Sequence, residues 1–367
     1  MKNNCGLYIH IPFCSSKCLY CDFYSKADSK EEINTYVDHM LWAAEKYGKK
    51  YSSKIFDTIY IGGGTPSVIG TNNLYSIIAA MKQHFKIISP EITVEMNPCS
   101  ARKIDFERLR GIGVNRISLG VQSANENELK VLGRIHRNND VKAAVEKIKS
   151  SGIDNISLDL MIGIPEQTTE SLKNSIDFCI ELEPKHISAY ILKIEENTPF
   201  KRLAPTLNLP NEDAQADFYE YMQDYLSKNG FEQYEISNFA QAGYESRHNI
   251  KYWQCDEYLG LGPSAHSMMN SKRFYFPRSI TDFYNNKTVY EGEGATSEEF
   301  IMLSMRLKTG LIFKEYTDFF HKPVPRQCIA VGKKYERYGY TRADNASVSL
   351  TPKGFLVSNA IIAEMLE

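Results

Sequence analysis

The sequence predicts an α/β fold, because strand-like and helix-like segments alternate through its first two-thirds. Six segments have the pattern of strands: 7–11, 58–61, 92–96, 116–119, 156–161 and 186–192. Helical patterns lie between them, and strands that alternate with helices form parallel sheets covered by helices. We therefore expect a parallel sheet with helices outside, either open or closed into a partial barrel.

The helices of this first part are predicted from caps and apolar stripes. Ser29 and Glu32 form a capping box ahead of an apolar stripe at residues 36–41. Further stripes run through residues 74–81 and 141–148, and a fourth helical segment covers residues 171–182. Each of these segments follows one predicted strand and precedes the next, as a strand–helix–strand unit requires.

The alternation ends after residue 195. Three prolines between residues 199 and 210 mark a connecting stretch, a helix is predicted over about 211–228, and residues 235–290 look irregular. Helical patterns resume with a capping box at Thr296 and Glu299. We expect an α/β core over 1–200, a connecting region over 201–290, and a helical, winged-helix-like C-terminal domain over 291–367.

Bulk properties narrow the class of protein. The 367 residues carry a formal net charge of −2, which gives no overall nucleic-acid signature, and no apolar stretch is long enough to span a bilayer. The first residues lack the apolar core of a signal peptide. Five of the eight cysteines are scattered rather than arranged as a disulfide framework, so we expect a reducing, cytoplasmic location.

Three cysteines near the N-terminus, Cys14, Cys18 and Cys21, indicate a metal centre. A structural zinc site takes four protein ligands, whereas this group provides only three thiolates. Three thiolates on one short loop suit a [4Fe–4S] cluster with one iron left open for a substrate. A zinc knuckle or a chance group of cysteines is the plainer alternative.

Polar or glycine-rich residues end each of the first five predicted strands. The cysteine loop follows the first strand, and residues 62–64, all glycine, follow the second. Glu95 ends the third strand, Gln122 follows the fourth, and Asp159 lies near the end of the fifth. Sites in parallel α/β barrels gather at the carboxyl ends of the strands, so we expect a binding site at this edge.

The spacing C-x3-C-x2-C, with Tyr20 before the last cysteine, resembles the radical S-adenosylmethionine (SAM) superfamily. The resemblance implies a partial (β/α)6 radical SAM barrel. It also implies a [4Fe–4S] cluster bound by the three cysteines, with SAM chelating the open iron and Tyr20 packing near the adenine.

The resemblance extends to one branch, the oxygen-independent coproporphyrinogen III dehydrogenases and their relatives. It implies a set of SAM contacts at matching motif positions, namely Tyr8, Gly63, Gly64, Thr65, Glu95, Gln122, Arg134 and Asp159. The plainer alternatives are a tight turn for the glycines and a solvated charge at a helix end for Arg134. His136 is interpreted as structural.

Within that branch the sequence is most similar to the HemW-type heme chaperones. The fourth cysteine of the dehydrogenases, two residues after the third, is replaced by Phe23, and their N-terminal extension is missing. An H-N-x-x-Y-W motif lies in the connecting region, followed by a family-like segment at 260–267. The resemblance implies heme contacts in this motif, at His248, Asn249, Tyr252 and Trp253, with His266 as a second candidate ligand. Alternatively, His248 and Asn249 hydrogen-bond the loop and the two aromatic residues are core.

We therefore expect a cytoplasmic heme chaperone without dehydrogenase activity. It would bind heme and transfer it to acceptor hemoproteins, using a [4Fe–4S] cluster, SAM and an electron donor. The alternative is a coproporphyrinogen III dehydrogenase, and a weaker one is an RNA-modifying enzyme. No nucleic acid is expected as a partner, because Glu336 interrupts the basic residues Lys333, Lys334 and Arg337. Transient contact with a membrane stays open.

Overall fold

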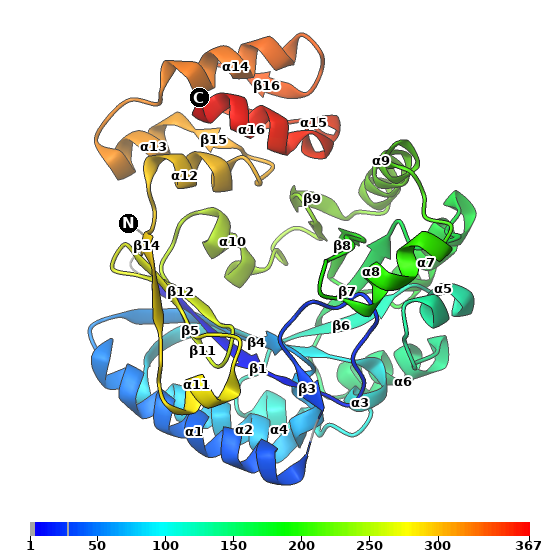
Figure 1. Ribbon diagram of the computed structural model, residues 1–367, viewed down its shortest axis with the longest axis vertical. Helices are drawn as coiled ribbons and strands as arrows, with labels where there is room; N and C mark the ends of the chain where they lie inside the picture. The colour runs from blue at the N-terminus through cyan, green and yellow to red at the C-terminus, as the bar shows by residue number, and fades with distance from the viewer. Residues whose placement is uncertain (1–3, 28) are drawn as a thin grey trace.

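A parallel sheet forms the centre of the protein in a computed structural model, which describes residues 4–27 and 29–367 (Figure 1). Six parallel strands lie side by side in chain order: β1 (Asn4–Ile11), β4 (Ile55–Gly63), β5 (Lys86–Met96), β6 (Arg116–Gln122), β7 (Asn155–Ile162) and β8 (His186–Ile191). All six predicted strands are present, and the predicted α/β fold class is confirmed.

Helices connect the successive strands and cover the outside of the sheet (Figure 1). The longer ones are α1 (Lys30–Lys50), α2 (Gly70–His84), α6 (Asn138–Ser150), α7 (Thr169–Glu181) and α9 (Glu212–Lys228), and the short α4 (Phe106–Gly111) lies between β5 and β6. Shorter elements are β2 (Phe13–Cys14), β3 (Lys26–Ala27), η1 (Pro66–Ile69), α3 (Pro98–Ala101), α5 (Glu126–Val131), α8 (Pro199–Leu203) and η2 (Ala204–Thr206). The predicted cap of the first helix is present, because the Ser29 side chain accepts a hydrogen bond from the Glu32 backbone N–H.

The six strands have one apolar and one polar face. On β6, Ile117, Leu119 and Val121 are buried in the core, while Arg116, Ser118, Gly120 and Gln122 occupy the alternate positions. The same alternation holds on the other strands, and we call the polar side the inner face. Parallel barrels usually fill this side with branched apolar residues, so a polar inner face indicates a binding function.

The expectation that residues 235–290 are irregular is wrong. β9 (Glu232–Glu235) and β10 (Asn238–Ala240) extend the sheet beyond β8, and β11 (Tyr258–Leu261) pairs in parallel with β1. β12 (His266–Met269), β13 (Lys272–Tyr275) and β14 (Val289–Glu293) continue the sheet, with α11 (Ile280–Tyr284) between the last two. These strands are short and pair onto existing edges, so their own periodicity is too weak to predict them.

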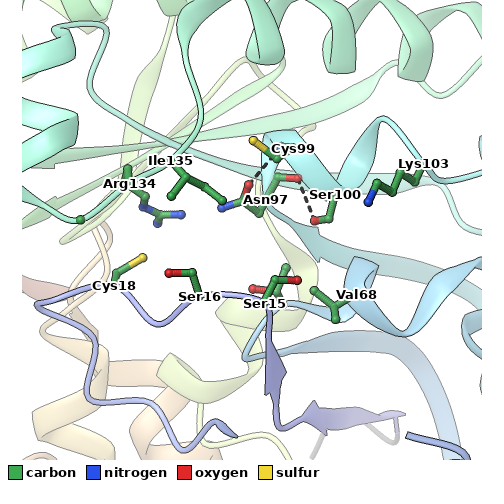
Figure 2. Close-up of a pocket in the computed structure, with 12 residues that line it drawn as sticks. Ser15, Ser16, Cys18, Val68, Asn97, Cys99, Ser100, Lys103, Arg134 and Ile135 are labelled. Carbon is green, nitrogen blue, oxygen red and sulfur yellow. Dashed lines mark hydrogen bonds between the residues drawn. The ribbon is translucent and has the colours of Figure 1, made fainter. Parts of the chain in front are cut away.

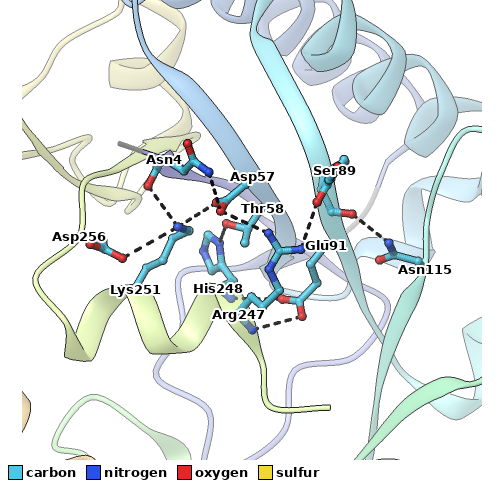
Figure 3. Close-up of polar contacts among 11 residues, drawn as sticks. Asn4, Asp57, Thr58, Ser89, Glu91, Asn115, Arg247, His248, Lys251 and Asp256 are labelled. Carbon is cyan, nitrogen blue, oxygen red and sulfur yellow. Dashed lines mark hydrogen bonds and ion pairs between the residues drawn. The ribbon is translucent and has the colours of Figure 1, made fainter. Parts of the chain in front are cut away.

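Helix α10 (Arg247–Trp253) contains the H-N-x-x-Y-W motif and lies against the amino ends of the strands (Figures 1 and 3). The Glu91 carboxylate of β5 accepts hydrogen bonds from the backbone N–H groups of Arg247 and His248, each at 3.1 Å. A carboxylate at a helix N-terminus satisfies free donors and complements the helix dipole. Glu91 therefore fixes the start of α10 on the sheet.

The same helix is held by a charged contact at its other end. The Lys251 ammonium lies 2.8 Å from a carboxylate oxygen of Asp57 and donates to the Asn4 carbonyl at 3.1 Å (Figure 3). Although burial alone would raise the pKa of Asp57, the hydrogen bond and charge of Lys251 hold that pKa below its usual range. Both side chains are mostly buried, with exposed fractions of 7% and 14%.

The C-terminal part has the helix–strand–helix–helix–strand–strand order of a winged helix. It consists of α12 (Ser297–Ser304), β15 (Leu311–Ile312), α13 (Phe313–Phe320), α14 (Arg326–Glu336), β16 (Thr341–Ala343), β17 (Ser347–Leu350), α15 (Pro352–Leu356) and α16 (Ser358–Leu366). Helix α16 packs on α14, where Glu364 accepts from Lys334 at 2.6 Å. The proposed division of the chain at residues 200 and 290 stays a prediction. Among the described helices, none is both long and apolar enough to cross a membrane.

We expect Lys251→Met to lower the free energy of unfolding by about 1–3 kcal/mol at pH 7, because it leaves the Asp57 carboxylate buried without its ammonium. Urea denaturation measures this. The loss should shrink as the pH falls through the lowered pKa of Asp57, since a protonated carboxyl no longer needs the cation. Lys308→Met, which removes an exposed ion pair with Glu232, is the matched control and should change little. Equal losses in both variants would contradict the prediction.

Candidate cofactor site

The three clustered cysteines lie on the loop that follows β1. Cys14 is buried at the end of β2, whereas Cys18 and Cys21 are half-buried, and all three are free thiols. Burial raises the pKa of Cys21, and the nearby Cys18 and Cys14 raise it further. Within the described residues no three His, Cys, Asp or Glu side chains are arranged for a single metal ion. Thiolates that each bind a different iron of one cluster need no such convergence on a single point.

Contacts from distant segments hold the cysteine loop in place. The backbone N–H of Leu19 donates to the Leu132 carbonyl at 3.3 Å, and the Leu19 carbonyl accepts from Phe200 at 2.9 Å. The Arg278 guanidinium donates to the Asp22 carboxylate at 3.1 Å and also to the Asp22 carbonyl. The loop is therefore fixed both to the helices after β6 and β8 and to the segment before α11.

Residues 62–64 are glycines for a steric reason, because neighbouring atoms leave no room for a side chain at these positions. A Cβ at Gly62 would lie 2.8 Å from the Glu95 carboxylate, and one at Gly63 would lie 2.6 Å from the His10 ring. Gly63 also has a φ of +107°, which side chains disfavour. Gly64 donates to the Ile11 carbonyl at 2.8 Å, so the turn packs directly on the strand before the cysteines. The turn therefore brings β4, Glu95 and the cysteine loop together.

Two half-buried carboxyls project from the inner face beside this turn. Glu95 accepts from the Tyr60 hydroxyl at 2.7 Å and from the Gly63 N–H at 3.1 Å, and Asp159 accepts from the Ser118 hydroxyl at 3.0 Å. Burial raises the pKa of both, that of Asp159 to about 7 with a further contribution from the Glu95 charge. A cationic ligand placed between them would stabilise their ionised forms.

Gln122 and Arg134 converge above the end of β6. Gln122 has a φ of +69° at an irregularity in the pairing of β6 with β7, and strained residues of this kind cluster at functional sites. A Cβ at Gly120 would lie 2.9 Å from the Gln122 amide nitrogen and 3.4 Å from the Arg134 guanidinium. Arg134 donates to the Tyr20 hydroxyl at 2.7 Å. Arg134 thus points into the site, and the interpretation as a solvated helix-end charge is wrong.

A cavity of about 180 Å³ opens between the cysteine loop and the carboxyl ends of β5 and β6 (Figure 2). Cys18 and Arg134 line it together with residues that sequence reasoning did not single out: Ser15, Ser16, Asn97, Cys99, Ser100 and Lys103. Asn97 follows directly after strand β5, which is the signal that would have found it. The cavity brings the cysteine loop and the predicted contacts Thr65 and Arg134 onto one surface.

His10 links Tyr8 to the cysteine loop and was also missed. Its Nε2 lies 2.8 Å from the Tyr24 carbonyl, which can only accept, so Nε2 carries the hydrogen. Its Nδ1 therefore accepts from the Tyr8 hydroxyl at 3.0 Å. Burial lowers the pKa of His10 to about 4, which keeps the ring neutral in this role. The signal that could have identified His10 is its position on β1, where its ring faces Gly63.

The structure does not bring the H-N-x-x-Y-W motif to the cysteine loop. His248 is buried at the amino ends of the strands, where Nδ1 lies 2.7 Å from the Thr58 hydroxyl and Nε2 lies 2.8 Å from the Tyr252 hydroxyl. In this conformation both ring nitrogens are hydrogen-bonded within the protein, so neither is available to coordinate an iron. Trp253 faces the C-terminal part, where it lines a second cavity with Phe300.

The two remaining motif candidates differ in exposure. The Asn249 backbone N–H donates to the Ser246 hydroxyl at 3.4 Å, as part of the cap of α10. His266 is half-exposed at the start of β12, where its ring stacks on Tyr275 and lies 3.5 Å from the Glu291 carboxylate. Of the two candidate heme-ligating histidines, His266 is therefore the accessible one.

Comparisons with known proteins agree with this geometry. Residues 8–179 match the radical SAM superfamily. The chain is 34% identical to the heme chaperone HemW of Lactococcus lactis subsp. lactis, over 98% of this chain and 96% of that protein. It is 32% identical to the heme chaperone HemW of Bacillus subtilis over 98% of each, and 40% identical to that of Escherichia coli over 71% of this chain and 69% of that protein.

Among solved structures, coproporphyrinogen III oxidase (HemN) from Escherichia coli superposes with a TM-score of 0.84. The match covers 99% of this chain and 90% of that chain at 19% identity, so it establishes a common fold. The relatives from Lactococcus lactis and Bacillus subtilis are similar along nearly their whole length. The chain therefore belongs to the heme chaperone HemW family within the radical SAM superfamily.

Proposed function

We propose that this protein is a heme chaperone, which binds heme and transfers it to acceptor hemoproteins in the cytoplasm. The similarity to curated heme chaperones over nearly the whole chain carries the proposal. Phe23, in place of the fourth cysteine expected of a dehydrogenase, agrees with it.

The donors on the cysteine loop fit a [4Fe–4S] cluster with one open iron. Cys14, Cys18 and Cys21 would hold it, because they are the free thiols of a single, well-anchored loop. Cys99 is also a free thiol and lines the adjoining cavity, but it follows β5 rather than lying on this loop. When bound with SAM, and with an electron donor as partner, the cluster supplies one-electron chemistry.

The inner-face residues fit SAM, whose sulfonium and amino groups are cationic. Glu95 and Asp159 would provide the carboxylates, and Gly63, Gly64 and Thr65 the close backbone approach. Tyr8, Tyr20, Gln122 and Arg134 would complete the contacts. The supporting observation is the pair of carboxyls whose pKa values are raised by burial, because a bound cation would relieve that cost.

Heme contact through His248, Asn249, Tyr252 and Trp253 is part of the proposal, but it requires α10 to rearrange. His248 would have to give up its hydrogen bond to Thr58 or Tyr252 before either nitrogen could face an iron. A bond that forms at this cost is weak, and weak bonding suits a protein that must release its cargo. His266, which is half-exposed, is the ligand that needs no rearrangement.

Two other functions are less well supported. A coproporphyrinogen III dehydrogenase is favoured only by a fold shared at 19% identity. Nucleic-acid binding by the C-terminal part is disfavoured because α16 packs on α14, and Lys334 pairs with Glu364 there. Electron donor, acceptor hemoproteins and any membrane contact stay proposals.

Replacing Cys14, Cys18 or Cys21 with alanine should abolish the brown chromophore after anaerobic reconstitution, because each thiolate holds one iron of the cluster. Visible absorption and iron and sulfide analysis measure this. Cys99→Ala and Cys255→Ala are the matched controls and should retain the cluster. Full iron and sulfide in any of the first three variants would overturn the ligand assignment.

The affinity for SAM should rise roughly tenfold between pH 6 and pH 8, because Asp159, whose pKa is about 7, must ionise to attract the cation. Asp159→Asn should remove this rise, whereas Glu183→Gln, at an exposed ion pair, should not. Equilibrium measurements of SAM binding at each pH, on the native protein and both variants, test this prediction. Since the folded-state pKa lies above the unfolded value, ionisation of Asp159 also costs stability as the pH rises from about 4 to 7, and Asp159→Asn should remove that loss too. A pH-independent affinity in the native protein would contradict the role of Asp159.

Heme-loaded protein, with its cluster reconstituted, should transfer heme to an apo-cytochrome under reducing conditions. The Soret absorption of the acceptor follows the transfer. In parallel, coproporphyrinogen III with SAM and a reductant should give no protoporphyrinogen. No transfer would refute the chaperone function, and porphyrinogen turnover would establish the dehydrogenase alternative.

A further inference from the structure

Three neighbouring side chains on the inner face leave buried polar atoms without a partner. Thr93, Arg116 and Asn155 are paired in register across β5, β6 and β7. They share the inner face with Glu95, Ser118 and Ser157, two positions further along each strand. The atoms without a hydrogen bond are Thr93 Oγ1, Arg116 Nε and Nη1, and Asn155 Oδ1. Such clusters are rare, because buried polar groups are nearly always bonded.

Arg116 is the most unusual of the three. It is 1% exposed and is the largest fully buried side chain. Within the described residues, no carboxylate forms an ion pair with it, whereas the buried Lys251 and the half-buried Arg273 each have one. An unpaired guanidinium out of contact with water is strongly destabilising.

The charge of Arg116 acts to lower the pKa values of Glu95 and Asp159, but burial raises both pKa values overall. The hydrogen bonds of Glu95 go to Tyr60 and Gly63 and that of Asp159 goes to Ser118, so neither carboxyl forms an ion pair with Arg116. His186 and His248 are kept neutral, because burial lowers both pKa values. The Arg116 charge lowers that of His186 further, and the charges of Lys251 and then Arg116 lower that of His248 further. The inner face therefore has a fixed positive charge at its amino end with neutral rings beside it.

We propose that Arg116, with Thr93, binds the carboxylate group of a ligand on the inner face. The guanidinium offers a planar fork of N–H donors that matches two carboxylate oxygens, and the Thr93 hydroxyl offers one more donor. The carboxylate belongs either to a free small acid or to a propionate arm of heme. The second source rests on the proposed heme-binding function.

Thermal unfolding of the full chain in sodium propionate tests the site, with chloride making up a constant sodium concentration. Tm of the native protein should rise by about 2 °C as propionate approaches ten times its dissociation constant. Arg116→Gln should lose the rise and Thr93→Val should reduce it. Arg273→Gln, which removes an arginine already paired with Glu299, is the matched control and should keep it.

The stability of a variant that lacks the Arg116 charge provides a second test. In chloride alone, Arg116→Met should be at least as stable as the native protein, because it removes an unpaired buried charge. In propionate the stability of the native protein should rise relative to that of Arg116→Met, because only the native protein binds the carboxylate. If Tm of the native protein is insensitive to propionate, or if Arg116→Gln shows the same rise, the proposal is wrong.

Heme and its dimethyl ester distinguish the two sources of the carboxylate. If a heme propionate binds Arg116, the native protein should bind the ester at least tenfold more weakly than heme, and Arg116→Gln should bind both equally. Equal binding of heme and ester by the native protein, together with the propionate response, would assign the site to a free small acid. Loss of the propionate response with intact heme transfer would refute this site and leave the chaperone function standing.

Discussion

The polar inner face of the parallel sheet is the constraint on which the rest of the structure depends. One face of every strand packs apolar side chains against the helices, so each intervening residue must point to the other side. There, groups such as Glu95 and His10 need a partner. The glycine turn after β4 brings the Gly63 N–H to Glu95, and the segment after the cysteines brings the Tyr24 carbonyl to His10, so both segments are positioned by satisfying these groups.

The inner face also joins two ends of the protein that differ in chemistry. Cysteines and carboxyls gather at the carboxyl ends of the strands, while α10 with its histidine lies across the amino ends. Tyr60 connects them: its ring stacks on His248 at a centroid distance of 5.1 Å, and its hydroxyl bonds Glu95. A change in α10 would therefore act directly on a side chain that supports the cofactor end.

The sequence was sufficient to predict the six parallel strands and the polar residues at their ends, because strand periodicity and parallel pairing alone bring Glu95, Gln122 and Asp159 to one edge. It was not sufficient for β9–β14, whose formation depends on sheet edges that the local pattern does not describe. Nor could it locate α10, because nothing in the H-N-x-x-Y-W letters says which end of the sheet they contact. The isolation of Arg116 is a property of its neighbours in space, so a single charged residue at the start of a strand gave no sign of it.

The pairing of β11 with β1 has a consequence for how the chain is made. Strand β1 is synthesised well before β11, so one of its two edges is covered only when residues 258–261 arrive. The Glu91 carboxylate likewise lacks its two hydrogen-bond donors until residues 247 and 248 have been synthesised. A nascent chain that has emerged as far as residue 200 therefore has the six parallel strands and the cysteine loop, but it still lacks Arg278, which anchors that loop, and the cover of the opposite end. During that interval the edge of β1 is unpaired, and an unpaired strand edge can pair with another chain and aggregate.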